Sequence, residues 1–302
     1  MLMALLPLLM VVVGPNVQTD TSFSVPRGSR LALHNFAGNV TVRPAARSTV
    51  RIQATHPEPM HVLVSREGTS YDVRTRGREL PQPPVDYLIT APAWMSLDLE
   101  GFHCDMDIDG WRSDVLAETV RGGVRLRGGQ GLIRLSSMTG GVDVSGAQGR
   151  IQLSSVESGI DVRDAAGEIT IEAVNGDVVL QRVHSRLVEA TTVNGDVTFT
   201  GWVEDDGRYR LATHRGNLDM RLPPAANATV VVSTFSGGFQ SDFPLRPGAL
   251  RPGRSFSFTL GDGRAHVDLQ SFEGRINLRQ GETPGPMPPA APASPATPAN
   301  ER

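Results

Sequence analysis

The acidic run Glu204-Asp205-Asp206, followed by Gly207 and Arg208, contains residue types that acid–base chemistry needs. Paired carboxylates serve as acid, base or nucleophile in glycoside hydrolysis. Such a pair requires a set separation, and no further column of acidic, His or Arg residues aligns beside this run. We therefore assign no catalytic residue. We interpret the run as a solvent-exposed loop, the best candidate for contact with a ligand or partner through Glu204, Asp205, Asp206 and Arg208.

The string VNGDV occurs at residues 174–178 and again at 193–197, and its aspartates are the residue type that binds calcium. Calcium-binding nonapeptide solenoids need the pattern G-G-x-G-x-D, and the Gly-rich half is missing from both copies. An Asn-Gly pair by itself is typical of a tight turn. We therefore predict structural turns at Asn175, Gly176, Asp177, Asn194, Gly195 and Asp196.

His103, Cys104 and Asp105 place three possible metal ligands together, but alternation along a strand sends Cys104 to the opposite face from the other two. Because Cys104 is the single Cys, an intramolecular disulfide and a multi-Cys zinc or iron–sulfur site are excluded. We interpret Cys104 as a small buried hydrophobic residue. The sequence indicates no metal and no cofactor, and the dispersed His residues include three that we expect at the surface: His34, His184 and His214.

Composition narrows the class of partner. The net charge is -3, with 29 basic residues that are all Arg and 32 acidic residues scattered among them. A nucleic-acid surface would need basic side chains clustered along one face, so we expect no nucleic-acid partner. Hydrophobic residues make up 39% of the chain and aromatic residues only 5%, so Val, Ile and Leu must line the core.

A strict repeat organises the chain between residues 93 and 222, where no Pro occurs. Since Pro supplies no N–H to a central strand, this absence is typical of a continuous ladder of strands. Pairs of apolar residues two apart recur at every ninth position, and spacing by two places both side chains on one face of a strand. The pairs are Leu97/Leu99, Met106/Ile108, Val115/Ala117, Val124/Leu126, Ile133/Leu135, Val142/Val144, Ile151/Leu153, Ile160/Val162, Ile169/Ile171 and Val178/Leu180.

A third apolar residue follows in each unit, and we expect it to point inward too: Met138, Ala147, Val156, Ala165, Val174 and Val183. Gly precedes many pairs at a fixed offset, at 122, 131, 140, 149, 167 and 176, where positive φ would serve a tight turn.

Alternate nine-residue units match better than neighbouring ones. "GLIRLSSMT" resembles "GRIQLSSVE", and "GGVDVSGAQ" resembles "SGIDVRDAA". The coil is therefore about eighteen residues with two strands, and stacked coils predict an all-β, parallel β-solenoid (β-helix). Eighteen-residue columns then place Arg125 by Asp143 and stack Arg150, Glu168 and Arg186.

The two VNGDV copies are nineteen residues apart, one more than a coil. We therefore predict that they stack with Val174 and Val193 inward, and that a bulge near Thr191 and Thr192 takes up the extra residue.

The remaining segments differ in composition. Residues 1–20 carry a short apolar run typical of a signal peptide or N-terminal anchor. Residues 21–92 and 223–280 keep the nine-residue spacing with interruptions by Pro, so we expect an irregular N-terminal β cap or flanking sheet and C-terminal coils with a cap around the regular solenoid at 93–222. Beyond the interruption, Phe258, Val267 and Ile276 resume nine-residue steps. Residues 281–302 are rich in Pro and Ala and predict a disordered tail.

Several segments resemble a known family: "LALHNFAGNVTVRP" from residue 31, "VDYLITAPAWMSLDLEG" from residue 85, the VNGDV units and the closing "SFEGRINL". In their order and spacing, over roughly residues 21–280, they resemble the bacterial "putative adhesin" family, domain of unknown function 4097 (DUF4097). The resemblance implies an extracytoplasmic β-strand-repeat protein of β-helix type, and it supplies no catalytic residues.

We therefore expect an exported, non-catalytic protein of the cell envelope or exterior that contacts a protein or glycan. Contact with a membrane is expected only through residues 1–20, if they are retained. A polysaccharide-active hydrolase or lyase, and a scaffold that polymerises end to end, are the alternatives.

Overall fold

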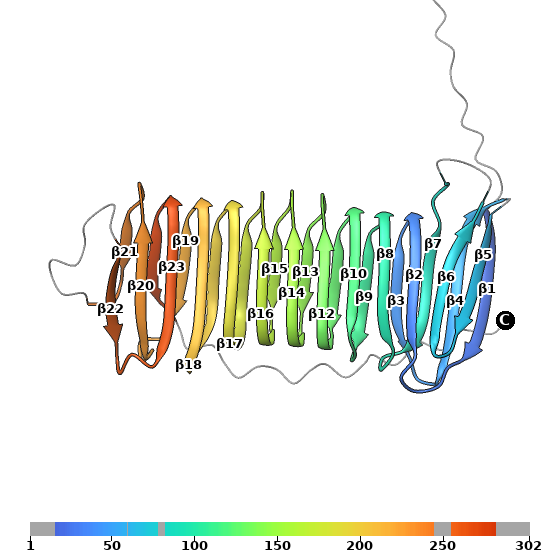
Figure 1. Cartoon of the computed structure of the whole chain (residues 1–302), viewed down its shortest axis with the longest axis horizontal. Helices are drawn as coiled ribbons and strands as arrows, with labels where there is room; N and C mark the ends of the chain where they lie inside the picture. Colours follow the sequence, from blue (N-terminus) through green and yellow to red (C-terminus); the bar gives the residue numbers. More distant parts are fainter. Residues whose placement is uncertain (1–15, 59, 78–81, 245–254, 282–302) are drawn as a thin grey trace, which may run out of the picture.

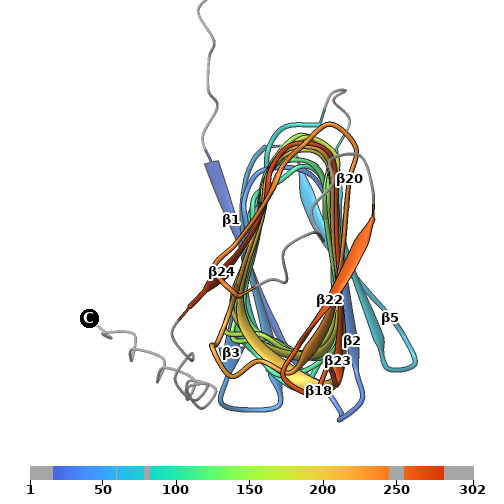
Figure 2. The ribbon, with the colours of Figure 1, turned by 90° about the vertical axis from the view of Figure 1, so that its left-hand side faces the viewer.

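The computed structural model describes residues 16–58, 60–77, 82–244 and 255–281 as a stack of short β-strands (Figure 1). The strands form one mixed sheet that winds round the long axis, so the fold is all-β and solenoid-like. Viewed along that axis, the coils superimpose as a flattened tube with two long sides (Figure 2). Within the described ranges there is no helix, and so none that is long and apolar enough to cross a membrane.

We call the two long sides wall A and wall B. The strands of wall A, in spatial order, are β5 (His61–Glu67), β6 (Ser70–Arg76), β2 (Arg30–Ala37), β8 (Ser96–His103), β10 (Val115–Arg121), β12 (Gln130–Ser137), β14 (Gln148–Ser155), β16 (Ala166–Ala173), β23 (Ala265–Glu273), β20 (Ala228–Thr234) and β22 (Phe256–Leu260). Those of wall B are β1 (Asn16–Ser24), β4 (Thr49–Pro57), β7 (Asp86–Pro92), β3 (Val40–Ala45), β9 (Met106–Trp111), β11 (Val124–Gly128), β13 (Val142–Ser145), β15 (Ile160–Arg163), β19 (Leu218–Leu222), β24 (Ile276–Gln280) and β21 (Phe239–Ser241).

Two long strands, β17 (Val178–Asn194) and β18 (Val197–Arg215), begin in wall B and continue round an edge into wall A, where they lie between β16 and β23. Pairing in the middle of the stack is parallel, and each residue has its partner eighteen positions along the chain. Ile133 lies beside Ile151, which lies beside Ile169 in wall A, and wall B shows the same offset.

Both ends of the stack depart from this order. The coil of β2 and β3 lies between the later strands β6–β7 and β8–β9. At the other end, β23 and β24 lie between β18–β19 and the earlier β20–β21.

The pairs β1–β4, β4–β7, β5–β6 and β20–β22 are antiparallel. These antiparallel pairs lie at the two ends of the stack, in the segments where we expected irregular caps, and they make the sheet as a whole mixed. Phe258 lies in β22, opposite Val230, and does not begin a further parallel coil.

The predicted terminal segments fall largely outside the described residues. Of the N-terminal segment 1–20, only residues 16–20 are described, and they form the first part of β1, paired with β4. Of the tail at 281–302, only Gly281 is described, and its N–H donates to the Leu222 carbonyl.

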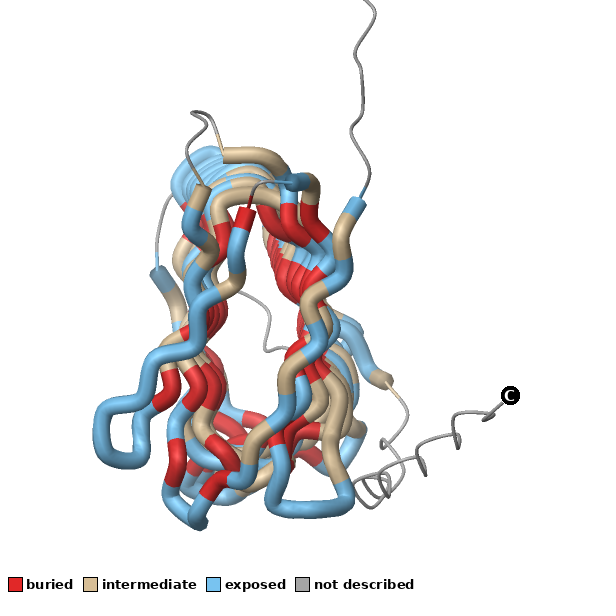
Figure 3. The backbone as a smooth tube through the Cα atoms, turned by 90° about the vertical axis from the view of Figure 1, so that its right-hand side faces the viewer, coloured by how far each residue is buried: buried red, intermediate tan, exposed pale blue. Residues whose placement is uncertain are grey.

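All ten predicted apolar pairs are buried, each member being no more than 2% exposed. The buried residues line the inner sides of both walls, as Figure 3 shows in red. The third apolar set, however, divides. Ala147, Ala165 and Val183 are fully buried, whereas the intervening members are among the exposed large hydrophobic residues: Met138, Val156, Val174 and, one coil further, Val193. The prediction that Val174 and Val193 point inward is therefore wrong.

Backbone conformation explains this division. In wall A, alternation places Ile133, Leu135 and Ser137 inward and sends the next residue, Met138, outward. In wall B, a residue with positive φ interrupts the alternation just before the third apolar residue and turns it inward. Such residues are Gly146, Asp164 and Arg182, with φ of 67°, 53° and 51°.

The extra residue of the second VNGDV copy is not near Thr191 and Thr192, which lie in a regular ladder. The pairing of β16 with β17 shifts from eighteen to nineteen between Ala166 and Glu168, so the extra residue lies beside Ser185 and Arg186. This shift moves Arg186 out of the predicted charge column. The other two predicted pairs form, with Arg150 at 3.0 Å from Glu168 and Arg125 at 3.4 Å from Asp143.

Candidate functional site

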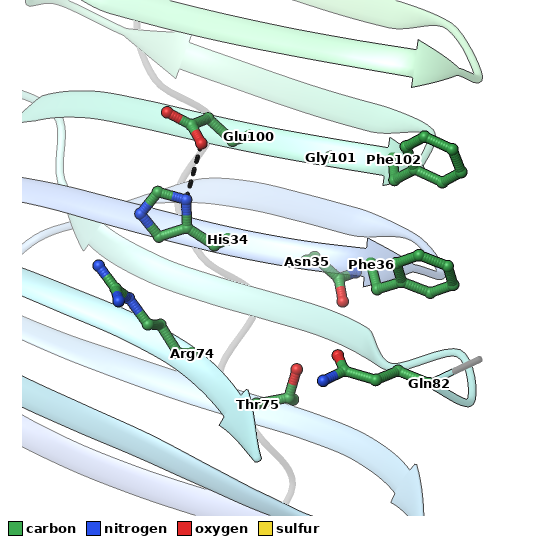
Figure 4. Close-up of a pocket in the computed structure, with 9 residues that line it drawn as sticks. All are labelled: His34, Asn35, Phe36, Arg74, Thr75, Gln82, Glu100, Gly101 and Phe102. Carbon is green, nitrogen blue, oxygen red and sulfur yellow. Dashed lines mark hydrogen bonds and ion pairs between the residues drawn. The ribbon is translucent and has the colours of Figure 1, made fainter. Parts of the chain in front are cut away.

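A groove of about 390 Å³ lies on wall A near the N-terminal end, where β6, β2 and β8 are neighbours (Figure 4). Parallel pairing brings the same strand position of β2 and β8 together, so that His34 lies beside Glu100 and Asn35 beside Gly101. Residues from three chain segments therefore share one surface: His34, Asn35, Phe36, Arg74, Thr75, Gln82, Glu100, Gly101 and Phe102.

Asn35 lies beneath the groove. It is only 4% exposed and follows the buried Leu31 and Leu33 in the alternation of β2, so its side chain faces the interior of the tube. Its Nδ2 donates to the Val85 carbonyl at 2.9 Å, while its Oδ1 is buried and has no hydrogen-bond partner among the described residues. Because this oxygen is not accessible from outside, it is not an acceptor for a ligand in the groove. Thr75 and Gln82, labelled in Figure 4, add polar groups to the lining.

Charged groups line one side of the groove. His34 Nδ1 lies 2.8 Å from Glu100, and its Nε2 lies 3.6 Å from Asp72. Arg74 contacts the same Asp72 at 2.7 Å, and this hydrogen-bonded carboxylate raises the pKa of Arg74 above its usual value. These side chains offer a fixed guanidinium, a carboxylate and an imidazole to a ligand.

Aromatic rings form the opposite side. The Phe36 and Phe102 rings stack at the ends of β2 and β8, with centroids 5.3 Å apart, and Phe102 is 43% exposed (Figure 4). An exposed ring beside hydrogen-bonding groups is typical of a site that fixes a ligand by shape and orients it by polar contacts.

The sequence reasoning missed this groove, apart from naming His34 as a surface residue. The signal was the similarity of "LALHNF" and "LDLEGF", whose apolar pairs and terminal Phe residues align. These strings are 66 residues apart, which is not a multiple of eighteen, because the β2 coil enters the stack out of chain order.

The Glu204–Arg208 segment is not a free loop. It lies within β18, where pairing with β17 jumps from Ser185–Val203 to Leu187–Arg208, so that the extra residues bulge outward. Glu204 pairs with His184, and Asp205 lies 2.7 Å from Arg264. Asp206 is exposed with φ of 63°, and Arg208 is exposed. The structure therefore places these acids at the surface, but Glu204 contacts the His184 imidazole and Asp205 contacts the Arg264 guanidinium.

Tyr209 anchors that bulge. Its hydroxyl donates to the Ser185 carbonyl at 2.5 Å and accepts from the Glu204 N–H at 2.8 Å. Burial raises the pKa of Tyr209 to about 12, so the phenol stays protonated and keeps both hydrogen bonds at neutral pH. The bulge is thus held by a buried side chain.

The VNGDV residues lie where wall A turns into wall B, and their Gly residues are required by close stacking. A Cβ on Gly195 would lie 2.1 Å from the Gly176 carbonyl oxygen, and one on Gly176 would lie 2.3 Å from that of Ser158. Neither Gly has a positive φ, nor does Gly140, so the expectation that all such Gly residues serve by positive φ is wrong at these positions.

The Asn and Asp residues of VNGDV bond vertically from coil to coil. Asn194 Nδ2 donates to Asn175 Oδ1 at 2.7 Å. Asp177 Oδ1 accepts from the Asp196 N–H at 2.8 Å, and Asp196 Oδ1 accepts from the Asn217 N–H at 2.6 Å. These carboxylates therefore serve as acceptors for the next backbone, the local role that Asp often takes in turns.

The other candidate residues are separate. Cys104 is fully buried, donates from Sγ to the Asn35 carbonyl at 3.4 Å, and has its pKa raised to about 11 by burial, in agreement with a small hydrophobic role. His184 and His214 are exposed, as expected. In the part of the chain that the structure describes, no three His, Cys, Asp or Glu side chains gather in a metal-binding group.

Comparison with known proteins agrees with this architecture. The chain is similar to a solved "putative adhesin" of Parabacteroides merdae, at 10% identity over 89% of this chain and 98% of that one, with a TM-score of 0.50. A "putative adhesin" and a "Putative lipid binding protein" of Parabacteroides distasonis match at 8% identity each, over 89% and 88% of this chain and 98% and 97% of theirs, with TM-scores of 0.46 and 0.45. No curated protein matches. The family model Toastrack DUF4097 matches residues 97–279, more than half of the chain, and the protein therefore belongs to the Toastrack DUF4097 family.

Proposed function

We propose that this protein is an adhesin-like binding protein that acts outside the cytoplasm and contacts a glycan or protein of the cell envelope or exterior, without turnover. The groove beside Phe36 and Phe102 is the ligand site. The observation that carries this proposal is the exposed Phe102 ring, stacked on Phe36, beside the charged side chains of His34, Arg74 and Glu100 in one groove. The description of a similarly folded protein as a "putative adhesin" supports it.

The chemistry of the groove suits a sugar better than an apolar ligand. A sugar ring presents C–H groups that pack on an aromatic face and hydroxyls that both donate and accept hydrogen bonds. Phe102 offers the exposed face, the side-chain oxygens of Glu100 and Gln82 can accept, and Arg74 can donate. A protein ligand would use the same groups through an amide or hydroxyl side chain.

The architecture supports a role in which the protein holds its ligand groove at one end of a rigid stack. We take the eighteen-residue, two-strand coil of a parallel solenoid as the unit that repeats through the middle of the chain, so that a rigid stack holds the groove at one end. Absence of turnover is inferred from the acids at the bulge, because Glu204 is engaged by the His184 imidazole and Asp205 by the Arg264 guanidinium.

A binding panel tests the proposal. The full chain is screened against glycans and envelope proteins beside Phe102→Ala and Arg74→Gln. We expect each substitution to weaken binding about tenfold, which is the effect of losing one aromatic or charged contact. Leu88→Ala, an equally exposed apolar residue on wall B, is the matched control and leaves binding unchanged.

Two results would overturn the proposal: no binding to any member of the panel, or binding that survives both groove substitutions. Release of reducing sugar by the wild type, abolished in Glu204→Gln or Asp205→Asn, would instead identify a polysaccharide-active enzyme.

A further inference from the structure

A single row of exposed apolar side chains runs along the edge toward which the arrowheads of β10, β12, β14 and β16 point in Figure 1. We call this row the apolar ladder. It consists of Met138, Val156, Val174, Val193, the imidazole of His214, and Phe272, and the same column continues past Met138 through the half-buried Val120 to Phe102 and Phe36 of the groove. The register places them in one column, since their neighbours pair directly: Ser137 with Ser155, Ser155 with Ala173, Asn175 with Asn194, and Arg215 with Glu273.

The ladder ends in stacked rings. His214 stacks on Phe272 at 4.7 Å between centroids, and Phe235 stacks on the other side of Phe272 at 4.6 Å. Phe235 is 65% exposed, and the ladder members with stated values are 39% to 51% exposed. The row has one residue per strand, and neighbouring strands lie about 4.8 Å apart. It therefore forms a continuous exposed apolar area, whereas the apolar residues of an ordinary surface are scattered singly.

Side chains next to the middle of the ladder are mostly small and uncharged. At two positions before or one position after the rungs from Met138 to Val193 lie Ser136, Ser154, Thr191, Thr139, Asn175 and Asn194, with Glu157 and Glu172 as the charged exceptions. Ser154 donates a hydrogen bond to Ser136 at 3.0 Å. We call these short hydroxyl side chains, Ser136, Ser154, Thr139 and Thr191, the Ser/Thr shelf, because they project less far from the strands than the ladder does. Apolar residues at the centre with charge at the margin are the anatomy of a protein–protein interface.

Area and charge together point to the occupant. From its exposed fractions, the ladder with Phe235 offers on the order of 600 Å² per copy, so two copies face to face reach about 1,200 Å², the lower bound of a stable interface. A second copy has the same spacing between strands. The ladder residues of one copy can therefore meet the ladder and shelf residues of the other at every strand along the contact. The charged neighbours Glu157, Glu172 and Glu273 outnumber Arg215, so anionic lipid would be repelled.

We propose that the apolar ladder is a homodimer interface, in which the ladder of one copy packs against the ladder and Ser/Thr shelf of a second copy of this chain. The contact joins the molecules side by side along their length and leaves the strands at both ends of each stack unused. It goes beyond ligand binding at the groove, whose rings Phe36 and Phe102 occupy the same column beyond Val120 and lie outside the proposed contact.

Sedimentation velocity of the full chain tests the proposal. We expect the wild type to sediment with twice the 32.4 kDa of one chain at micromolar concentration. In Met138→Arg/Val174→Arg, two guanidinium groups would be buried in the contact, so we expect the dimer Kd to rise about 100-fold or more. Leu63→Arg/Leu88→Arg makes the same chemical change at equally exposed residues away from the ladder and remains dimeric.

A wild type that stays monomeric over the whole concentration range overturns the proposal, as does a dimer that survives Met138→Arg/Val174→Arg. Unchanged thermal unfolding of the variants excludes misfolding as the cause of a monomer. As a second measurement, Val156→Cys is treated with a short bismaleimide; since Cys104 is buried, we expect cross-linked dimer there and none in Leu88→Cys. Wild-type monomer that co-sediments with phosphatidylglycerol vesicles, lost in the ladder variant, would identify a lipid surface instead.

Discussion

The two edges of the tube use the same nine-residue sequence pattern in opposite ways. Where wall A turns into wall B, the third apolar residue is outside, as at Met138, and a Gly packs against the backbone of the coil before it. Where wall B turns into wall A, the third apolar residue is inside, as at Ala147, and a residue with positive φ precedes it. Close contact between coils occurs at both edges, since a Cβ on Gly149 at the second edge would lie 2.2 Å from the Gly131 oxygen; the edges differ in the positive φ that turns the third apolar residue inward at the second.

Hydroxyl groups accompany the first edge. Ser137 Oγ donates to the Gly122 carbonyl at 2.8 Å and accepts from the Gly140 N–H at 2.9 Å. The next coil repeats the donation from Ser155 to the Gly140 carbonyl, and later coils repeat it from Thr192, Thr213 and Ser271 to the carbonyls of Gly176, Gly195 and Gly216. These buried hydroxyls satisfy turn carbonyls that face the interior, so a polar residue follows the apolar pair at this edge.

We expect the largest difference in the free energy of unfolding between substitutions of one Gly from each edge. A Cβ on Gly140 would lie 1.9 Å from the Gly122 oxygen, whereas one on Gly146 meets only an atom at 3.9 Å. We expect Gly140→Ala to lower the free energy of unfolding by about 3 kcal/mol or more, because two backbones must separate. We expect Gly146→Asp to cost less than about 1 kcal/mol, because φ of 67° suits Asp and Asp164 already occupies the equivalent place. Urea unfolding of both variants measures the difference, and equal losses would contradict it.

The second comparison concerns the third apolar residue itself. Val183 is fully buried and Val174 is 39% exposed. Val183→Ala should lower the free energy of unfolding by about 2 kcal/mol, since it leaves a cavity in the core. Val174→Ala should change the stability of the monomer by less than about 0.5 kcal/mol. Chemical denaturation at low protein concentration, where the contact between copies is dissociated, tests this, and a larger loss at Val174 would reverse the assignment of the edges.

The third comparison removes the hydroxyl at the first edge. Ser137→Ala leaves the Gly122 carbonyl and the Gly140 N–H without their partner, so we expect a loss of about 1 to 2 kcal/mol in the free energy of unfolding. Ser136→Ala, one residue earlier and facing outward, is the matched control and should be near neutral. Ala173 occupies the corresponding position of one coil, which indicates that a single replacement does not prevent folding.

The smallest expected effect lies at the second edge and depends on pH. Arg182 donates twice to Asp164 at 2.6 Å and holds the pKa of that carboxyl below its ordinary value of 3.8. Because the pKa is lowered in the folded state, the ion pair stabilises the fold at pH above 3.8, and this contribution is lost as pH falls through the folded pKa.

Asp164→Asn should therefore be less stable than the wild type by under about 1 kcal/mol at neutral pH, with the difference shrinking as pH falls below 3.8 and vanishing below the lowered pKa of the folded state. Thermal melts at several pH values measure it. A difference that persists at acid pH would show that the hydrogen bonds to Arg182, and not the charge on Asp164, carry the effect.

Much of the middle of the fold could be predicted, since burial at alternate positions requires an alternation of apolar and polar residues that is visible in the sequence. All ten apolar pairs face the core, and the Arg125–Asp143 and Arg150–Glu168 contacts follow from the same spacing. The bulge beside Ser185 was misplaced by several residues because a register shift leaves no compositional trace.

The groove could not be predicted, because it depends on which coils are neighbours. His34 and Glu100 lie on strands that the chain order separates, and they meet only because the β2 coil enters between β6 and β8. A local pattern cannot report such an exchange.

The sequence by itself determined the repeat and the ten buried apolar pairs, because each coil pairs with the next and burial at alternate positions recurs in every copy. The tertiary structure decided which edge exposes its third apolar residue, which coils are exchanged at the ends, and which side chains gather in the groove and the ladder. The physical reason is that these features depend on the backbone conformation of single residues, such as the positive φ of Asp164, and on close contacts between backbones, such as that of Gly195 with Gly176. Neither is encoded by hydrophobicity.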